Sequence, residues 1–174
     1  PYYFCKGERL MKKILATAMA SLAATGALAQ TEINGTVDSK CIVMTDTAGV
    51  FGNPSPNLLT TDPQNGGVQP TIRYDVIAAD FYKAVISYPV EFTSSPALSD
   101  VVNWTGDVNV SEVSDTLMSD YDSNKVTYNN THEYNMSVAG STWFQISSEA
   151  DYGFAKSLPA GNYTAVVLAE CIPL

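Results

Sequence analysis

Short segments in which apolar and polar residues alternate constrain this chain most strongly, because a side-chain period of two indicates a β-strand. The clearest of them covers 161–171 and follows the turn residues Leu158-Pro159-Ala160-Gly161. Its odd-numbered residues would share one face of the strand: Tyr163, Ala165, Val167 and Ala169. Thr164, Val166, Leu168 and Glu170 would share the other face. We therefore predict a late strand of a β-sandwich here.

Similar segments recur along the chain at near-regular spacing. The predicted strands cover 31–46, 71–77, 81–92, 101–104, 108–113, 125–128, 133–138, 143–146 and 161–171. A helix over 76–85 is the alternative to strands there, but β-branched and aromatic residues dominate both flanks. Hairpins are predicted across 105–107 and across 129–132, and 48–67, with three prolines and four glycines, is predicted to be a long loop. The pattern predicts an all-β, immunoglobulin-like two-sheet sandwich of about eight short strands.

The N-terminal region has the features of a bacterial export signal. Met11-Lys12-Lys13 supplies the positive start, 14–25 is apolar and rich in small residues, and Ala27-Leu28-Ala29 forms the cleavage site. The apolar run is too short for a membrane span, and no second run of that length follows. We expect a signal peptide at 11–29, a single mature domain at 30–174 in the periplasm, at the cell surface or outside the cell, and no membrane insertion after cleavage. Residues 1–10 are interpreted as untranslated, since codons for Lys6-Gly7-Glu8 can contain a ribosome-binding sequence just before Met11.

Two cysteines remain in the predicted mature domain, Cys41 and Cys171, once Cys5 is set aside with residues 1–10. An even pair in an oxidising compartment predicts a disulfide, which would join the two ends of the domain. The competing interpretation, a metal-binding or nucleophilic pair, is disfavoured because no histidine lies near either cysteine in sequence.

The mature domain is strongly acidic. Its 17 acidic and five basic residues leave a net charge of −12. Because such a surface repels phosphate groups, we expect no nucleic-acid partner and no binding to anionic membranes.

The sequence contains little that suggests catalysis. The one histidine, His132, falls in a predicted polar turn, and neither a nucleophile elbow nor a histidine zinc motif occurs. We therefore predict a non-enzymatic protein without a cofactor.

One acidic run resembles a metal site in part. Asp120, Asp122 and Asn124 begin like an EF-hand loop, but Lys125 replaces its glycine and Thr131 its final glutamate. The EF-hand interpretation therefore fails, and these three residues stay as calcium candidates in a surface loop.

Two tryptophans could form a sugar-stacking surface. Trp104 and Trp143 are the candidates, although burial is expected for Trp143 because it adjoins Phe144.

The two ends of the mature domain carry a family resemblance. The pattern Ile33-x-Gly35-x-Val37-x-x-x-Cys41 and the closing Leu158-Pro159-Ala160-Gly161-x-Tyr163-x-x-x-Val167 resemble fimbrial subunits of the chaperone–usher pathway. The resemblance implies a sandwich that lacks its last strand. A periplasmic chaperone supplies that strand first, and the N-terminal extension of another subunit supplies it afterwards.

Carried over to this chain, the resemblance makes 31–38 the donor segment, with Ile33, Gly35 and Val37 entering the groove. The groove would be lined by Tyr163, Ala165, Val167 and Ala169. The implied function is an exported structural or adhesive surface subunit whose partners are further copies of itself and a chaperone. The alternative is a monomeric secreted sandwich that binds glycan or calcium.

Overall fold

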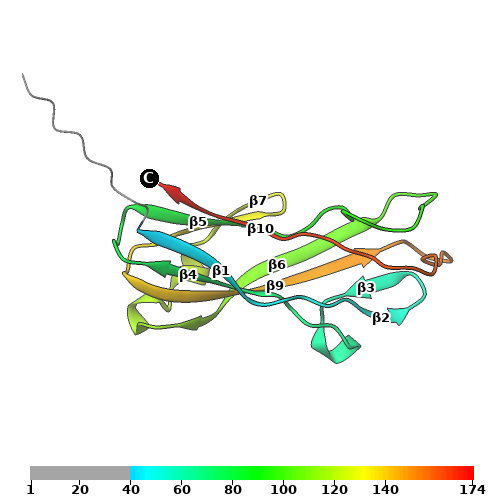
Figure 1. The fold of residues 1–174 in the computed structure, drawn as a ribbon, viewed down its shortest axis with the longest axis horizontal. Coiled ribbons are helices and arrows are strands. Elements are labelled where there is room, and N and C mark those ends of the chain that lie inside the picture. Colours follow the sequence, from blue (N-terminus) through cyan, green and yellow to red (C-terminus); the bar gives the residue numbers. More distant parts are fainter. Residues whose placement is uncertain (1–39) are drawn as a thin grey trace, which may run out of the picture. The chain divides into compact units, whose positions relative to one another are not determined.

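The computed structural model describes residues 40–174, which form a sandwich of two antiparallel β-sheets (Figure 1). The strands are β1 (Cys41–Thr47), β2 (Gly52–Ser55), β3 (Leu58–Thr60), β4 (Thr71–Val76), β5 (Tyr82–Ser87), β6 (Asn103–Val113), β7 (Val126–Tyr128), β8 (Thr131–Asn135), β9 (Gly140–Asp151) and β10 (Leu168–Pro173). The helical elements are short: η1 (Pro63–Asn65), η2 (Thr116–Met118) and α2 (Tyr121–Asn124). The predicted all-β two-sheet sandwich is confirmed, with ten strands in the described part of the chain.

The order of the strands determines which of them form the edges of the two sheets. The six-stranded sheet runs β1-β4-β9-β3-β2, with β6 along the other side of β9, and the four-stranded sheet runs β10-β5-β8-β7. Strand β9 is long enough for β4 to pair with its first half and β3 with its second. The edge strands are therefore β1, β2 and β6 in one sheet and β10 and β7 in the other.

Aromatic residues fill the centre of the core. The ring of Phe144 lies 5.4 Å from that of Tyr74 and 4.5 Å from that of Tyr134, and all three side chains are fully buried. The Tyr134 hydroxyl donates to the carbonyl of Val108 at 2.6 Å, and that of Tyr74 to the carbonyl of Glu170 at 3.1 Å. Burial raises the pKa of both phenols, so they remain protonated donors that tie one sheet to the other.

Several predicted strands are confirmed. Strand β4 lies within 71–77, β5 lies within 81–92 and ends before Pro89, and the predicted hairpin over 125–138 is formed by β7 and β8. The predicted strand over 31–46 is β1 from Cys41 onward; its earlier part, the signal peptide and residues 1–10 lie outside the described residues.

The predicted hairpin over 101–113 is wrong. Strand β6 runs through Gly106 without a turn and pairs with β9 along its whole length. A Cβ atom on Gly106 would lie 2.6 Å from the carbonyl oxygen of Ser147 and 2.7 Å from the ring of Tyr88. The glycine therefore permits close packing against a neighbouring strand and an aromatic ring.

The predicted long loop over 48–67 is also wrong, because it contains β2, β3 and η1. Strand β3 extends the pairing of β9, and Leu59, Thr60 and Thr61 are buried. A Cβ on Gly52 or Gly67 would clash with the backbone around residues 60–66, so these glycines allow close approach of the backbone.

Only part of the closing segment, residues 161–171, pairs continuously with a neighbouring strand. Strand β10 pairs with β5 from Leu168, whereas Thr164 makes an isolated bridge with Ser94. The predicted alternation is confirmed, since the odd-numbered residues from Tyr163 to Cys171 are half-buried and the even-numbered residues 164–170 are exposed.

Candidate functional site

The edges of the two sheets meet along β1 and β10, and the predicted disulfide joins them at one end. Cys41 opens β1 and Cys171 lies in β10, and the bridge between them holds their Cα atoms 6.3 Å apart. The two edges run antiparallel, because Thr45 and Val167 line one cavity further along.

Both edges present backbone groups without a strand partner. The amide of Ile77 donates to the carbonyl of Lys40. By alternation, the backbone N–H and C=O groups of the even-numbered residues of β1 point toward β4. The backbones of Thr164 and Ser94 exchange two hydrogen bonds. The backbone N–H and C=O groups of the even-numbered residues in 161–171 therefore point toward β5 and the segment that follows it. By alternation, the backbone groups of Val43 and Thr45 face the gap from one side. Those of Ala165, Val167 and Ala169 face it from the other.

The width of this gap decides where a further strand fits. Neighbouring strands are about 4.8 Å apart, so a strand between two edges needs them roughly 9.6 Å apart. At the Cys41–Cys171 bridge the edges are too close for an inserted strand. Away from the bridge they diverge, and the space between residues 45–51 and 161–167 is a groove.

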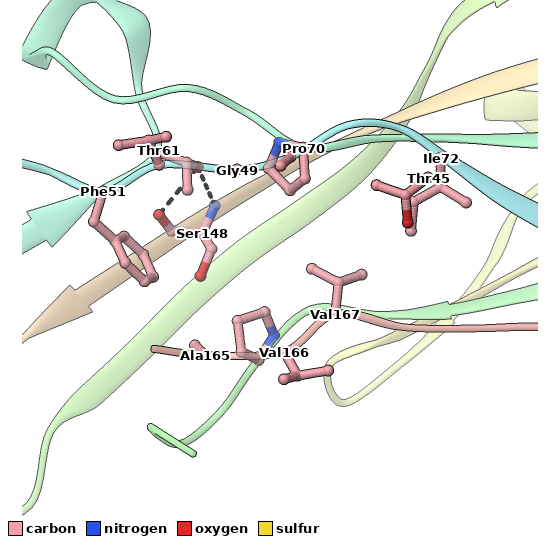
Figure 2. A pocket seen from close by; sticks show the side chains of 13 residues that line it. Thr45, Gly49, Phe51, Thr61, Pro70, Ile72, Ser148, Ala165, Val166 and Val167 are labelled. Atoms are coloured by element: carbon pink, nitrogen blue, oxygen red, sulfur yellow. Dashed lines mark hydrogen bonds between the residues drawn. The ribbon is translucent and has the colours of Figure 1, made fainter. Parts of the chain in front are cut away.

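The inner part of the groove is an apolar cavity of about 270 Å³. Figure 2 shows Gly49, Pro70 and Ile72 on one side of the cavity and Ala165 and Val167 on the other. Its position between two strand edges suits an extended chain.

One polar atom in this cavity has no hydrogen-bond partner. The backbone of Ser148 exchanges bonds with Thr61, whose hydroxyl accepts from the Ser148 amide at 2.8 Å. The Ser148 hydroxyl itself is buried without a partner, although a lone buried hydroxyl is unfavourable. Figure 2 shows Ser148 projecting from β9 toward the cavity.

The groove continues into a more polar cavity of about 420 Å³, which begins beside Gly49 and ends at Gly161 and Asn162. An aromatic cluster formed by Phe51, Phe92, Trp104 and Tyr163 lies at this end. The rings of Phe92 and Tyr163 are 5.0 Å apart and those of Phe92 and Trp104 4.7 Å apart. Trp104 thus packs against Phe51 and Phe92 and is half-buried.

The structure places the four groove candidates in two different surroundings. Tyr163, Ala165 and Val167 line the two cavities, while Ala169 packs against the core beside the disulfide. The donor candidates Ile33, Gly35 and Val37 lie outside the described residues. Sequence reasoning missed the opposite wall, residues 48–51, because it fell in the predicted loop. The apolar pair Val50-Phe51 was the one available signal.

Polar side chains close the opposite pair of edges, between β6 and β7. The Lys125 ammonium donates to the carbonyl of Val108 at 2.7 Å and to the carboxylate of Asp107 at 3.0 Å. These bonds tie the start of β7 to the middle of β6. The open side of the sandwich is therefore the one between β1 and β10.

The prediction that His132 lies in a solvated turn is wrong. The turn of the β7–β8 hairpin is formed by residues 129–130, so His132 falls within β8 and is 3% exposed. Its Nδ1 is 3.2 Å from the Thr127 hydroxyl, and its Nε2 is 3.7 Å from the Asp107 carboxylate. Burial, followed by the positive charge of Lys125, lowers the pKa of His132 below 6.5.

The calcium candidates do not converge on a common point. Both oxygens of Asp122 accept from the amide of Val110 at 3.0 Å, whereas Asp120 accepts from the side chain of Asn124. Among residues 40–174 no group of three or more histidine, cysteine, aspartate or glutamate side chains is arranged to hold a metal ion.

The expected burial of Trp143 is wrong. Consecutive residues of a strand point to opposite faces, so the burial of Phe144 places Trp143 on the outer face of its sheet. There it is half-buried under the guanidinium of Arg73, which lies 5.8 Å from the ring centre.

Comparison with known proteins adds no functional assignment, since no protein-family model, curated protein or solved structure matches this chain. Within residues 40–174, none of the helices has the length and apolar character needed to cross a membrane.

Proposed function

We propose that this chain is an exported, non-enzymatic structural or adhesive subunit that assembles by β-strand addition. Residues 31–38 of one copy would enter the groove between β1 and the closing segment of another. The observation that supports this most directly is the groove itself, an apolar cavity between two edges whose backbone groups lack strand partners.

Backbone geometry supports an extended ligand. An inserted strand would bond to Thr45 on one side and to Ala165 and Val167 on the other. It would join the two sheets across their open side, and strand addition of this kind takes its affinity from main-chain hydrogen bonds.

The side chains of the groove fit the alternation of residues 31–38. Ile33 would fill the inner cavity, Val37 would lie nearer the open end, and the small Gly35 between them suits a shallow part of the groove.

The position of the disulfide favours insertion from another copy over insertion of the chain's own extension. The extension joins the domain at Lys40, directly before Cys41, where the edges are too close to admit a strand. A segment from another copy enters at the open end, where the second cavity lies. The same groove could receive the strand of a periplasmic chaperone before assembly.

The proposed location rests on the disulfide and on the signal at 11–29. Disulfides persist in oxidising compartments, and the Cys41–Cys171 bridge is compatible with export. Periplasm and cell surface are the compartments that suit an assembling subunit.

The alternative of a monomeric domain that binds glycan or calcium has less support. Asp122 is engaged by a backbone amide, and Trp104 is half-buried against Phe51 and Phe92. We therefore favour assembly.

Peptide binding tests the proposal. The acceptor is the mature chain 30–174 with Ile33→Ser and Val37→Ser, which removes its own donor side chains and leaves the groove unchanged. A peptide of residues 30–39 should bind one-to-one and, at a hundredfold excess over Kd, raise the free energy of unfolding by about 2.7 kcal/mol. The control peptide carries the same two serines and should not bind. If calorimetry detects no binding of the native peptide, the proposal is wrong.

A further inference from the structure

The end of the domain that carries the disulfide exposes a patch of apolar side chains. Ile77 and Phe81, in the connection between β4 and β5, are 70% and 66% exposed, and Leu174 is 70% exposed. The amide of Ile77 donates to the carbonyl of Lys40 at 2.8 Å, and that of Leu174 to the carbonyl of Phe81 at 3.0 Å. These three residues, here named the exit patch, therefore lie beside the point where residues 1–39 join the domain.

The opposite end exposes a single phenylalanine on a well-held turn. Phe154 is 98% exposed. The flanking Gly153 and Ala155 have φ angles of 102° and 59°, and Asp151 accepts from the amide of Gly153 at 2.8 Å. Lys156 forms an ion pair with Asp100 at 2.9 Å. The turn thus projects its aromatic side chain into solvent at this end of the domain, at a point that is here named the tip.

The tip lies next to the open end of the groove. Strand β9 ends at Asp151, which pairs with Leu58, and the adjacent Leu59 lines the second cavity. The amide of Leu158, four residues after Phe154, donates to the carbonyl of Pro56 at 2.8 Å. A strand that enters the groove from its open end therefore passes close to the tip.

The short stretch of chain between the donor segment 31–38 and the domain brings the exit patch of one copy close to the tip of another. This step rests on the proposed function. Only Asp38 and Ser39 separate Val37 from Lys40, so the Cα atoms of Val37 and Lys40 are at most about 11 Å apart. When Val37 of one copy occupies the open end of another copy's groove, Lys40 must lie within that distance. The exit patch of the first copy then faces the tip of the second.

We propose that Phe154 of one copy packs against Ile77 and Phe81 of the next, which makes a head-to-tail contact beside the inserted strand. The contact joins two different surfaces of the same chain, so it does not close on itself in a dimer and repeats along a filament. It covers apolar side chains that are otherwise exposed at both ends of the domain. The inserted strand supplies the main-chain bonds, and the contact fixes how successive copies are oriented.

Two variants of the mature chain test the contact, Phe154→Ser and Phe81→Ser. Filaments of either variant should dissociate at least about tenfold faster than wild-type filaments on dilution, since burial of one large apolar side chain corresponds to roughly that factor or more. Phe154→Leu should restore most of the difference. The matched control is Val126→Ser, which removes a 58% exposed side chain from β7 and should behave as wild type.

Peptide binding separates this inference from the proposed function. The peptide of residues 30–39 lacks the exit patch, so it should bind with equal affinity to acceptor chains with and without Phe154→Ser. Failure of the peptide to bind any acceptor overturns the proposed function and the contact with it. Equal peptide binding together with wild-type dissociation of Phe154→Ser filaments overturns the contact alone. Weaker peptide binding by the Phe154→Ser acceptor also overturns it, because the residue would then act on the groove.

Discussion

Removal of the Cys41–Cys171 bridge should strongly destabilise the domain. The bridge joins residues 130 positions apart, and the chain-entropy relation for a loop of that size gives about 5 kcal/mol at 25 °C. Small domains are stable by only about 5–15 kcal/mol, so this loss is a large part of the total. The double variant Cys41→Ala, Cys171→Ala should therefore show a much lower free energy of unfolding than the wild type.

Urea denaturation of the monomer measures this effect. The denaturant dependence of the free energy should also increase, because an unfolded chain without the bridge exposes more surface. Wild-type protein treated with a reductant is the control and should match the double variant. A loss below about 1 kcal/mol with unchanged denaturant dependence would show that the bridge does not constrain the unfolded chain in the way reasoned here.

Three further predictions concern the groove and the closed side of the sandwich. Ser148→Ala should leave the monomer as stable or slightly more stable in urea denaturation, since it removes a buried hydroxyl without a partner; a loss of more than about 1 kcal/mol would show that the hydroxyl is hydrogen-bonded in the folded domain. Because burial lowers the pKa of His132, the unfolded chain binds the proton more tightly, so the free energy of unfolding should fall as the pH drops below about 6.5. His132→Gln should lose this dependence in urea titrations at pH 7.0 and 5.5. The same change in free energy between the two pH values in both proteins would contradict the prediction. Gly35→Leu should block assembly and leave the thermal midpoint of the monomer unchanged; a monomer destabilised by about 1–3 kcal/mol that still assembles would mean that Gly35 packs in the domain's own interior.

Local alternation and turn residues were enough to predict much of the sandwich. The strand over 71–77 and the hairpin of β7 and β8 follow from period-two patterns with polar turns between them. The disulfide followed from the count of cysteines and the expected compartment. Alternation also predicted that Tyr163, Ala165 and Val167 share one face, and these residues line the two cavities.

Other features depended on contacts between residues distant in sequence. Gly106 resembles a turn residue in its local sequence, but its role is to let β6 pass close to Tyr88 and β9. Residues 48–67 resemble a loop because they are rich in proline and glycine, yet β3 forms because the second half of β9 offers an edge with which it can pair. Register along β9 likewise buries Phe144 and turns Trp143 outward.

The sequence by itself determined that this chain makes short strands, which of their faces are apolar, and which two cysteines pair, since these depend on composition and on neighbouring residues. Only the tertiary structure decided which edges stay open. Lys125 bridges β6 and β7 on one side, whereas on the other the disulfide brings β1 and β10 together at one end and leaves a groove beyond it. The width of that gap depends on how two sheets pack, and no local pattern encodes the distance between strands that are remote in sequence.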